Sequence, residues 1–93
     1  MTKSAKALIA YAEAKGKEVK TYTDSMGTPY FWLNWSRGVW YVFHDDKRRG
    51  VFFSYRYSQN TRKTEKCTGG AFEKGLKILE DSGAVKIAHY FNS

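Results

Sequence analysis

The residues best suited to acid-base or nucleophilic chemistry are few and scattered along the chain. His44, Asp45 and Asp46 are consecutive, and an imidazole beside carboxylates is the raw material of general acid-base and metal sites. Neighbouring residues on a strand point to opposite faces and paired aspartates are typical of turns, so we interpret this triplet as the start of a turn. Cys67 and His89 have no sequence neighbour that would activate the thiol or complete a metal site. We therefore expect no enzyme activity, no metal and no cofactor.

Aromatic and basic residues are more informative. Phe, Trp and Tyr make up 17% of the chain, and eleven of these rings lie between Tyr30 and Tyr57. From Lys47 to Lys66 there are seven basic residues and one acidic residue, Glu65, a local net charge of +6 in a chain of net charge +7. Rings stack on the bases of single strands and cations hold phosphates, so this combination favours a polyanionic partner.

These residues predict a basic protein that binds nucleic acid, with single-stranded DNA or RNA favoured. The expected stacking residues are Tyr30, Trp32, Trp40, Phe43 and Phe52. The expected phosphate-binding residues are Arg37, Lys47, Arg48, Arg49, Arg56, Arg62, Lys63 and Lys66. Tyr, Trp and Arg also dominate protein interfaces, so a small phage-type inhibitor or adaptor that binds a host protein through the same patch is the alternative.

Periodicity predicts the elements that position these residues. Apolar residues recur on one face of 4–14, which predicts an amphipathic helix that ends at Gly16. Runs of β-branched and aromatic residues predict four strands, at 19–23, 29–35, 39–44 and 51–57. The connections between these strands are short, including a polar loop over 45–50, so neighbouring strands must be antiparallel.

The remainder of the chain predicts a second helix and a last strand. Residues 58–70 have no apolar periodicity and read as a mobile, polar and basic connector. A helix over 71–82 places Phe72, Leu76 and Leu79 on one stripe, and 85–91 reads as a final strand. The expected fold is a single α+β domain over 1–93, in the order α-β-β-β-β-α-β, with two helices packed on a mostly antiparallel sheet of four to five strands. Alternation leaves rings on both faces of this sheet, and we expect one face to stay uncovered for a partner.

One stretch of the predicted sheet is similar to a known family. The strand beginning Gly38-Val39-Trp40, the turn at 45–48, a further strand and the helix over 71–82 resemble the three-stranded-sheet DNA-binding domains of phage-type integrases and plant ethylene-response factors. In that family the sheet enters the major groove. The resemblance implies a double-stranded DNA partner contacted by Arg37, Arg48 and Arg56.

The expected cellular location follows from the cysteine count and from the lengths of the apolar runs. A lone cysteine, Cys67, allows no internal disulfide, and no apolar run reaches the length of a membrane span or a signal-peptide core. We expect a cytoplasmic protein that does not enter membranes. An uncovered sheet edge would also allow a homodimer.

Overall fold

The computed structural model describes residues 1–48, 50–66 and 69–84, without the side chain of Lys66. The elements are α1 (Lys3–Ala14), β1 (Glu18–Thr23), β2 (Pro29–Ser36), β3 (Val39–Asp46), β4 (Gly50–Ser58), β5 (Lys63–Lys66) and α2 (Gly69–Ser82). The five strands form one antiparallel sheet in chain order, from β1 to β5. The predicted α+β class, with two helices and a mostly antiparallel sheet, is confirmed.

The element order differs from the prediction in the second half of the chain. The segment 58–70 is not only a connector, because it contains β5, which pairs with β4. The predicted loop over 45–50 is shorter than expected, since β3 continues to Asp46 and β4 already begins at Gly50. The predicted strand over 85–91 lies outside the described residues.

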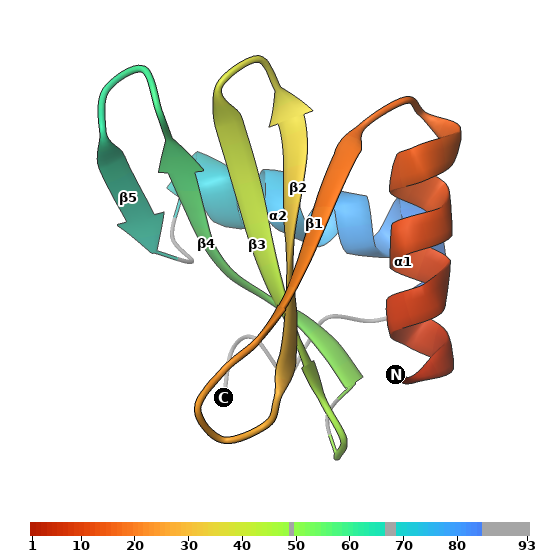
Figure 1. The fold of residues 1–93 in the computed structure, drawn as a ribbon. Helices are drawn as coiled ribbons and strands as arrows, with labels where there is room; N and C mark the ends of the chain where they lie inside the picture. Colours follow the sequence, from red (N-terminus) through yellow and green to blue (C-terminus); the bar gives the residue numbers. More distant parts are fainter. Residues whose placement is uncertain (49, 67–68, 85–93) are drawn as a thin grey trace.

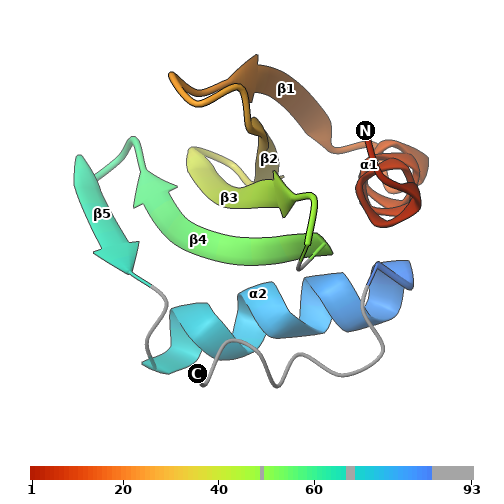
Figure 2. The same cartoon turned by 90° about the horizontal axis from the view of Figure 1, so that it is seen from below.

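Both helices lie on the same side of a strongly curled sheet. Figure 2 shows the strands bending around an inner side, while α1 and α2 follow the outer side of the curl. Helix α2 crosses β4, and α1 packs against α2, β1 and β4 (Figure 1). The sheet therefore has one helix-covered face and one face that neither helix touches.

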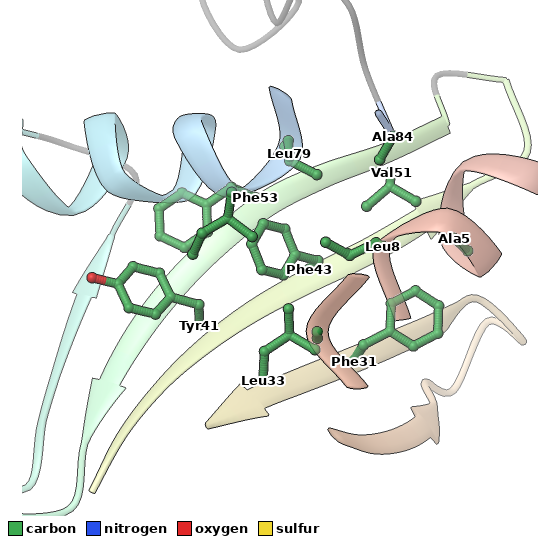
Figure 3. Packing of buried hydrophobic residues seen from close by; sticks show 12 residues of the cluster. Ala5, Leu8, Phe31, Leu33, Tyr41, Phe43, Val51, Phe53, Leu79 and Ala84 are labelled. Atoms are coloured by element: carbon green, nitrogen blue, oxygen red, sulfur yellow. The ribbon is translucent and has the colours of Figure 1, made fainter. Parts of the chain in front are cut away.

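The hydrophobic core fills the space between the helices and the covered face. Alternate residues of β2, β3 and β4 point into it, and α1 and α2 supply aliphatic side chains from the other side (Figure 3). The largest fully buried side chains are Tyr41, Phe31, Phe43, Phe53, Leu8, Leu33, Leu79, Val42 and Val51. All of these except Val42 belong to the core between the sheet and the helices.

Helix α1 is fixed at both ends by specific hydrogen bonds. The Thr2 hydroxyl accepts a bond from the Ala5 amide, as an N-cap does, and donates to the buried carboxylate of Asp45 on β3 at 2.7 Å. At the other end Gly16 adopts a φ of 73°, and the Lys17 amide donates back into the last turn. This is the Schellman arrangement, in which a residue without a Cβ is favoured. The chain can then turn directly into β1.

Helix α2 docks through small residues as well as through part of the predicted stripe. Its buried residues are Ala71, Gly75, Ile78 and Leu79. Of the predicted stripe, Leu79 is buried in the core, Phe72 is partly buried and packs against the core, and Leu76 is only partly buried. Small side chains at 71 and 75 let the helix backbone approach the β4 ring of Phe53 closely.

Candidate functional site

The face of the sheet that α1 and α2 leave uncovered carries a second set of rings. Trp32 on β2 pairs with Val42 on β3, and Val42 pairs with Tyr55 on β4, so the three side chains share one side. The same register assigns the other members. We call the set the aromatic face: Tyr22, Tyr30, Trp32, Trp40, His44, Phe52, Tyr55 and Tyr57.

A β-bulge determines which rings of β4 reach this face. Val42 and Phe43 are neighbours on β3, yet their partners on β4, Tyr55 and Phe53, are two residues apart. Ser54 is the extra residue, and an extra residue interrupts the in-out alternation of a strand. The rings after the bulge are therefore turned to the uncovered side.

One group of rings on the aromatic face is centred on Trp32. Its ring centroid lies 6.0 Å from that of Trp40, 6.1 Å from that of Tyr55 and 5.8 Å from that of Tyr57, in edge-on or tilted contacts. Trp40 is only 5% exposed at the base of this group. These contacts hold the rings in fixed positions, so a partner meets a preformed surface.

A second group forms a row across four strands. Tyr22 of β1 stacks on Tyr30 of β2, Tyr30 stacks on His44 of β3, and His44 stacks on Phe52 of β4, with centroid separations of 5.4, 5.1 and 5.7 Å. Ser54, the bulge residue, hydrogen-bonds to the His44 imidazole through its hydroxyl. Tyr22, at the sheet edge, is 43% exposed, which leaves the end of the row accessible to a further planar group.

The aromatic face contains a small hollow. It is lined by four of the rings together with one cationic and one amide side chain, and its volume is about 160 Å³. The lining residues are Lys20, Tyr22, Tyr30, Trp32, Trp40 and Gln59. The Lys20 ammonium lies 5.0 Å from the centroid of the Trp40 ring, within cation–π distance.

Basic residues gather at one end of the sheet, beside this hollow. The turn between β4 and β5 lies against the turn between β2 and β3, because the Gln59 amide donates to the Gly38 carbonyl at 2.7 Å. The link between α1 and β1 reaches the same end (Figure 1), where the Lys17 ammonium donates to the Trp35 carbonyl at 2.8 Å. We call the cations of these three connections the basic rim: Lys15, Lys17, Arg37, Arg62 and Lys63. Within the rim, the Lys15 ammonium lies over the Tyr11 ring and the Lys17 ammonium over the Trp35 ring, on the helix-covered side rather than at the hollow. Glu13, Glu18 and Glu65 are the acidic residues near it in sequence.

The opposite end of the sheet is not a basic surface among the described residues. Lys47 and Arg48 share a depression of about 350 Å³ with Asp45, Asp46 and the turn between β1 and β2. The Asp46 carboxylate also accepts a hydrogen bond from the Arg48 amide. The positive charge of the segment 47–66 is therefore divided between two ends of the molecule, and the carboxylates offset the part contributed by Lys47 and Arg48.

Burial shifts two titratable groups on the aromatic face. Desolvation lowers the pKa of His44 below its usual value near 6.5, and the negative charge of Asp24 opposes this shift. Desolvation also raises the pKa of the Tyr55 phenol, with a smaller contribution from Tyr30. His44 is thus neutral at physiological pH and is part of the ring stack rather than one of the cations.

The structure places the predicted stacking residues on both faces. Tyr30, Trp32, Trp40 and Phe52 lie together on the aromatic face, although Trp40 is almost fully buried. Phe43 was assigned to the wrong face: it is 0% exposed, within the core between sheet and helices, where no ligand can reach it. Strict alternation along β3 already separates it from Trp40.

The predicted cations are also divided. Arg37, Arg62 and Lys63 belong to the basic rim, whereas Lys47 and Arg48 lie at the far end. Arg49 and the side chain of Lys66 lie outside the described part of the chain.

Arg56 was expected to hold phosphate, but the bulge turns it to the helix-covered side. It forms an ion pair with Glu65 at 2.6 Å, and a side-chain hydrogen bond with Tyr41, followed by the Glu65 interaction, raises the pKa of its guanidinium. The charge of Arg56 is therefore paired within the protein, where it links β4 to β5.

The sequence interpretation missed half of the aromatic face and half of the residues that line the hollow. Tyr22, His44, Tyr55, Tyr57, Lys20 and Gln59 were not among the predicted site residues. Alternation along the strand could have added His44, because it shares the parity of Trp40. Tyr22 joins the face through its pairing with Tyr30 across the sheet, which alternation along one strand does not give. Tyr55 and Tyr57 could not be found in this way, since the bulge reverses their parity.

Comparison with protein-family models gives no match to this chain, and comparisons with curated proteins and with solved structures give none either. Neither helix in the described ranges has the length and apolarity that crossing a membrane requires. Within the same ranges, no group of three or more His, Cys, Asp or Glu side chains converges on a point. The functional argument therefore depends on the aromatic face and the basic rim.

Proposed function

We propose that this chain is a non-enzymatic protein that binds single-stranded nucleic acid, with bases on the aromatic face and phosphates along the basic rim. The observation that carries the proposal is the position of the two features side by side, with Gln59 belonging both to the turn of the rim and to the lining of the hollow. Stacking of a base on an aromatic side chain contributes about 1–3 kcal/mol and tolerates any sequence.

The shape of the face favours a single strand over a duplex. The major groove is about 12 Å wide and admits an element that projects from the protein, such as a helix or a two-stranded ribbon. The aromatic face is the inner side of a curled sheet (Figure 2), so it cannot enter a groove in the way that the integrase resemblance implies. In addition, Arg37, Arg48 and Arg56 do not share a surface.

The size of the face sets the length of strand. An eight-residue strand such as β3 spans about 25 Å. This length is suited to about four nucleotides or slightly more, at the lower end of the site sizes known for small single-strand-binding domains.

Fluorescence titration tests the proposal. Trp32 and Trp40 lie on the aromatic face and Trp35 does not, so in the variant Trp35→Phe all tryptophan emission comes from the proposed site. We expect unlabelled single-stranded octamers to quench this emission at low salt, with an affinity that falls as salt rises. The absence of both quenching and a mobility shift at low salt would overturn the proposal.

Charge reversal distinguishes the basic rim from general positive charge. Arg37→Glu with Arg62→Glu should weaken binding at least tenfold and reduce the salt slope by about 1.4, the value for two phosphate contacts on a single strand. The matched control reverses two exposed lysines on α1, Lys3→Glu with Lys6→Glu, which changes the net charge equally on the other side of the molecule. Equal loss of affinity in the two variants would mean that the rim has no special role.

A protein partner remains the competing class. Tyr and Trp are typical of protein hot spots, and the aromatic face would suit a partner of that kind as well. If the purified protein binds no oligonucleotide while a specific protein stays bound through nuclease treatment, the aromatic face is a protein-docking surface and the nucleic-acid proposal is wrong.

A further inference from the structure

The hollow on the aromatic face has the size of one six-membered ring. Its volume is about 160 Å³. A cavity of about 150 Å³ inside a protein is enough to hold benzene. A two-ring purine would have to leave part of its surface outside, whereas a pyrimidine base fits within the hollow.

The walls of the hollow are suited to a flat group. Tyr22, Tyr30, Trp32 and Trp40 all contribute, and Tyr22 and Tyr30 are themselves stacked at 5.4 Å. Tyr22 is the most exposed of these rings and lies at the sheet edge, where it can adjust to an entering base. Insertion of one planar ring extends aromatic contacts that are already present.

The charge in the hollow decides between two kinds of ligand. Four rings around a small space could also form a cage for a quaternary ammonium ion. Here the Lys20 ammonium already occupies the cation–π position on Trp40, and none of the lining residues is a carboxylate. A second cation would be repelled, while a neutral ring that carries an acceptor oxygen would be attracted.

We propose that this hollow holds one pyrimidine base of the bound strand, with the Lys20 ammonium donating a hydrogen bond to the carbonyl oxygen at C2. Thymine, uracil and cytosine all carry that carbonyl, so the site selects pyrimidines as a class. The amide of Gln59 lies at the mouth and can donate to or accept from the variable edge of the base. The neighbouring phosphates then reach Arg62, which lies on the same turn as Gln59. This inference rests on the proposed function.

Binding of short homopolymers tests the selection. Fluorescently labelled octamers of thymidylate, deoxycytidylate and deoxyadenylate are titrated with the protein at one low salt concentration. We expect both pyrimidine octamers to bind about tenfold more tightly than the adenylate octamer, within the range that one misfitting group produces in a binding pocket. Free adenylate stacks on itself, so the informative quantity is the change in this ratio between variants.

Two variants act on the hollow and one serves as the control. Gln59→Phe fills the hollow from an exposed turn, and Lys20→Met removes the ammonium while keeping most of the side-chain length. Both should bring the pyrimidine-to-purine ratio close to one. Phe52→Leu changes the aromatic face outside the hollow and should weaken all three octamers while leaving the ratio unchanged.

The outcomes separate the two proposals. If no octamer binds, the proposed function fails and the pyrimidine site fails with it. If the octamers bind without base preference, or with a preference that survives Gln59→Phe, only the pyrimidine site is overturned. Displacement of the strand by tetramethylammonium chloride, but not by sodium chloride of equal ionic strength, would show a cation cage and would also overturn it.

Discussion

The close contact between Gly75 and Phe53 predicts that adding one methyl group at position 75 destabilises the packing of α2 on the sheet. Gly75 lies in the middle of α2, and a Cβ built on it would lie 2.5, 2.6 and 2.8 Å from the Cγ, Cδ2 and Cδ1 atoms of Phe53. These are rigid ring atoms, and the ring is 2% exposed and packed against Tyr41 and Phe43. The substitution Gly75→Ala must therefore move the helix or the ring.

Two opposing effects set the size of the change. Alanine in a helix interior is favoured over glycine by about 1 kcal/mol. Overpacking a core costs about 1–3 kcal/mol, and three contacts this short indicate the upper end of that range. We expect Gly75→Ala to lower the free energy of unfolding by about 2 kcal/mol, which corresponds to a fall in melting temperature of about 10 °C for a domain of this size.

Urea unfolding followed by circular dichroism measures this change, with Gly70→Ala as the matched control. A Cβ at Gly70 meets nothing within 4 Å, so that variant should be as stable as the wild type or up to about 1 kcal/mol more stable. In a Phe53→Ala background, which lacks the Cγ, Cδ1 and Cδ2 atoms, Gly75→Ala should no longer lower the free energy of unfolding. If Gly75→Ala proves as stable as the wild type, the close approach of α2 to β4 does not limit packing and the reasoning is wrong.

Three further predictions concern the helix cap, the ring stack and the cations. Thr2→Val removes the α1 cap and one partner of the buried Asp45 carboxylate, so the free energy of unfolding should fall by about 1–2 kcal/mol in urea titrations, whereas Thr2→Ser should cost much less. The pKa of His44 is lower in the folded protein than in the unfolded chain, so the unfolded chain binds the proton first as the pH falls. The stability that neutral His44 contributes is therefore complete above about pH 6.5 and decreases as the pH falls from there through the folded pKa. Urea titrations between pH 8 and pH 5 should show this slope in the wild type and a flatter one in His44→Phe, which keeps a ring between Tyr30 and Phe52. Arg62→Gln should reduce the salt slope of oligonucleotide binding by about 0.7 while Arg56→Gln leaves it unchanged, since only the first guanidinium is free of the contacts with Glu65 and Tyr41.

Elements with strong periodicity could be read from the sequence. The first four strands and both helices lie within a few residues of their predicted positions, because alternating rings and the apolar stripe of α1 are local signals. Strand β5 had no such signal. Its residues Lys63–Lys66 are polar, and the strand is defined by its antiparallel pairing with β4, across which Arg56 forms an ion pair with Glu65. Pairing partners of this kind are fixed by tertiary structure rather than by composition.

The sequence predicted which part of the fold carries the candidate site, but not all of the residues that form it. Aromatic content directed the prediction to the sheet, but the face to which the rings after the bulge in β4 turn depends on one inserted residue, Ser54. The basic run from Lys47 to Lys66 looked continuous in sequence, yet β4 separates Lys47 and Arg48 at one end of the sheet from Arg62 and Lys63 at the other. A charged segment that contains a whole strand is spread over the length of that strand.

Hydrogen bonding distinguishes the two ring-lined faces of the sheet and supports the assignment of roles. On the covered side, the buried Asp45 carboxylate accepts two bonds from Thr2, as a closed core requires. On the other side, the indole nitrogen of Trp32 and the amide oxygen of Asn34 are buried without a hydrogen-bond partner among the described residues. Each buried polar group without a hydrogen bond lowers the stability of the fold by about 1–3 kcal/mol. A surface that served only as a second core would be more stable without such groups. In the proposed complex, a base beside Trp32 would reach these two groups only if the surrounding rings move, because both atoms are buried in the free protein.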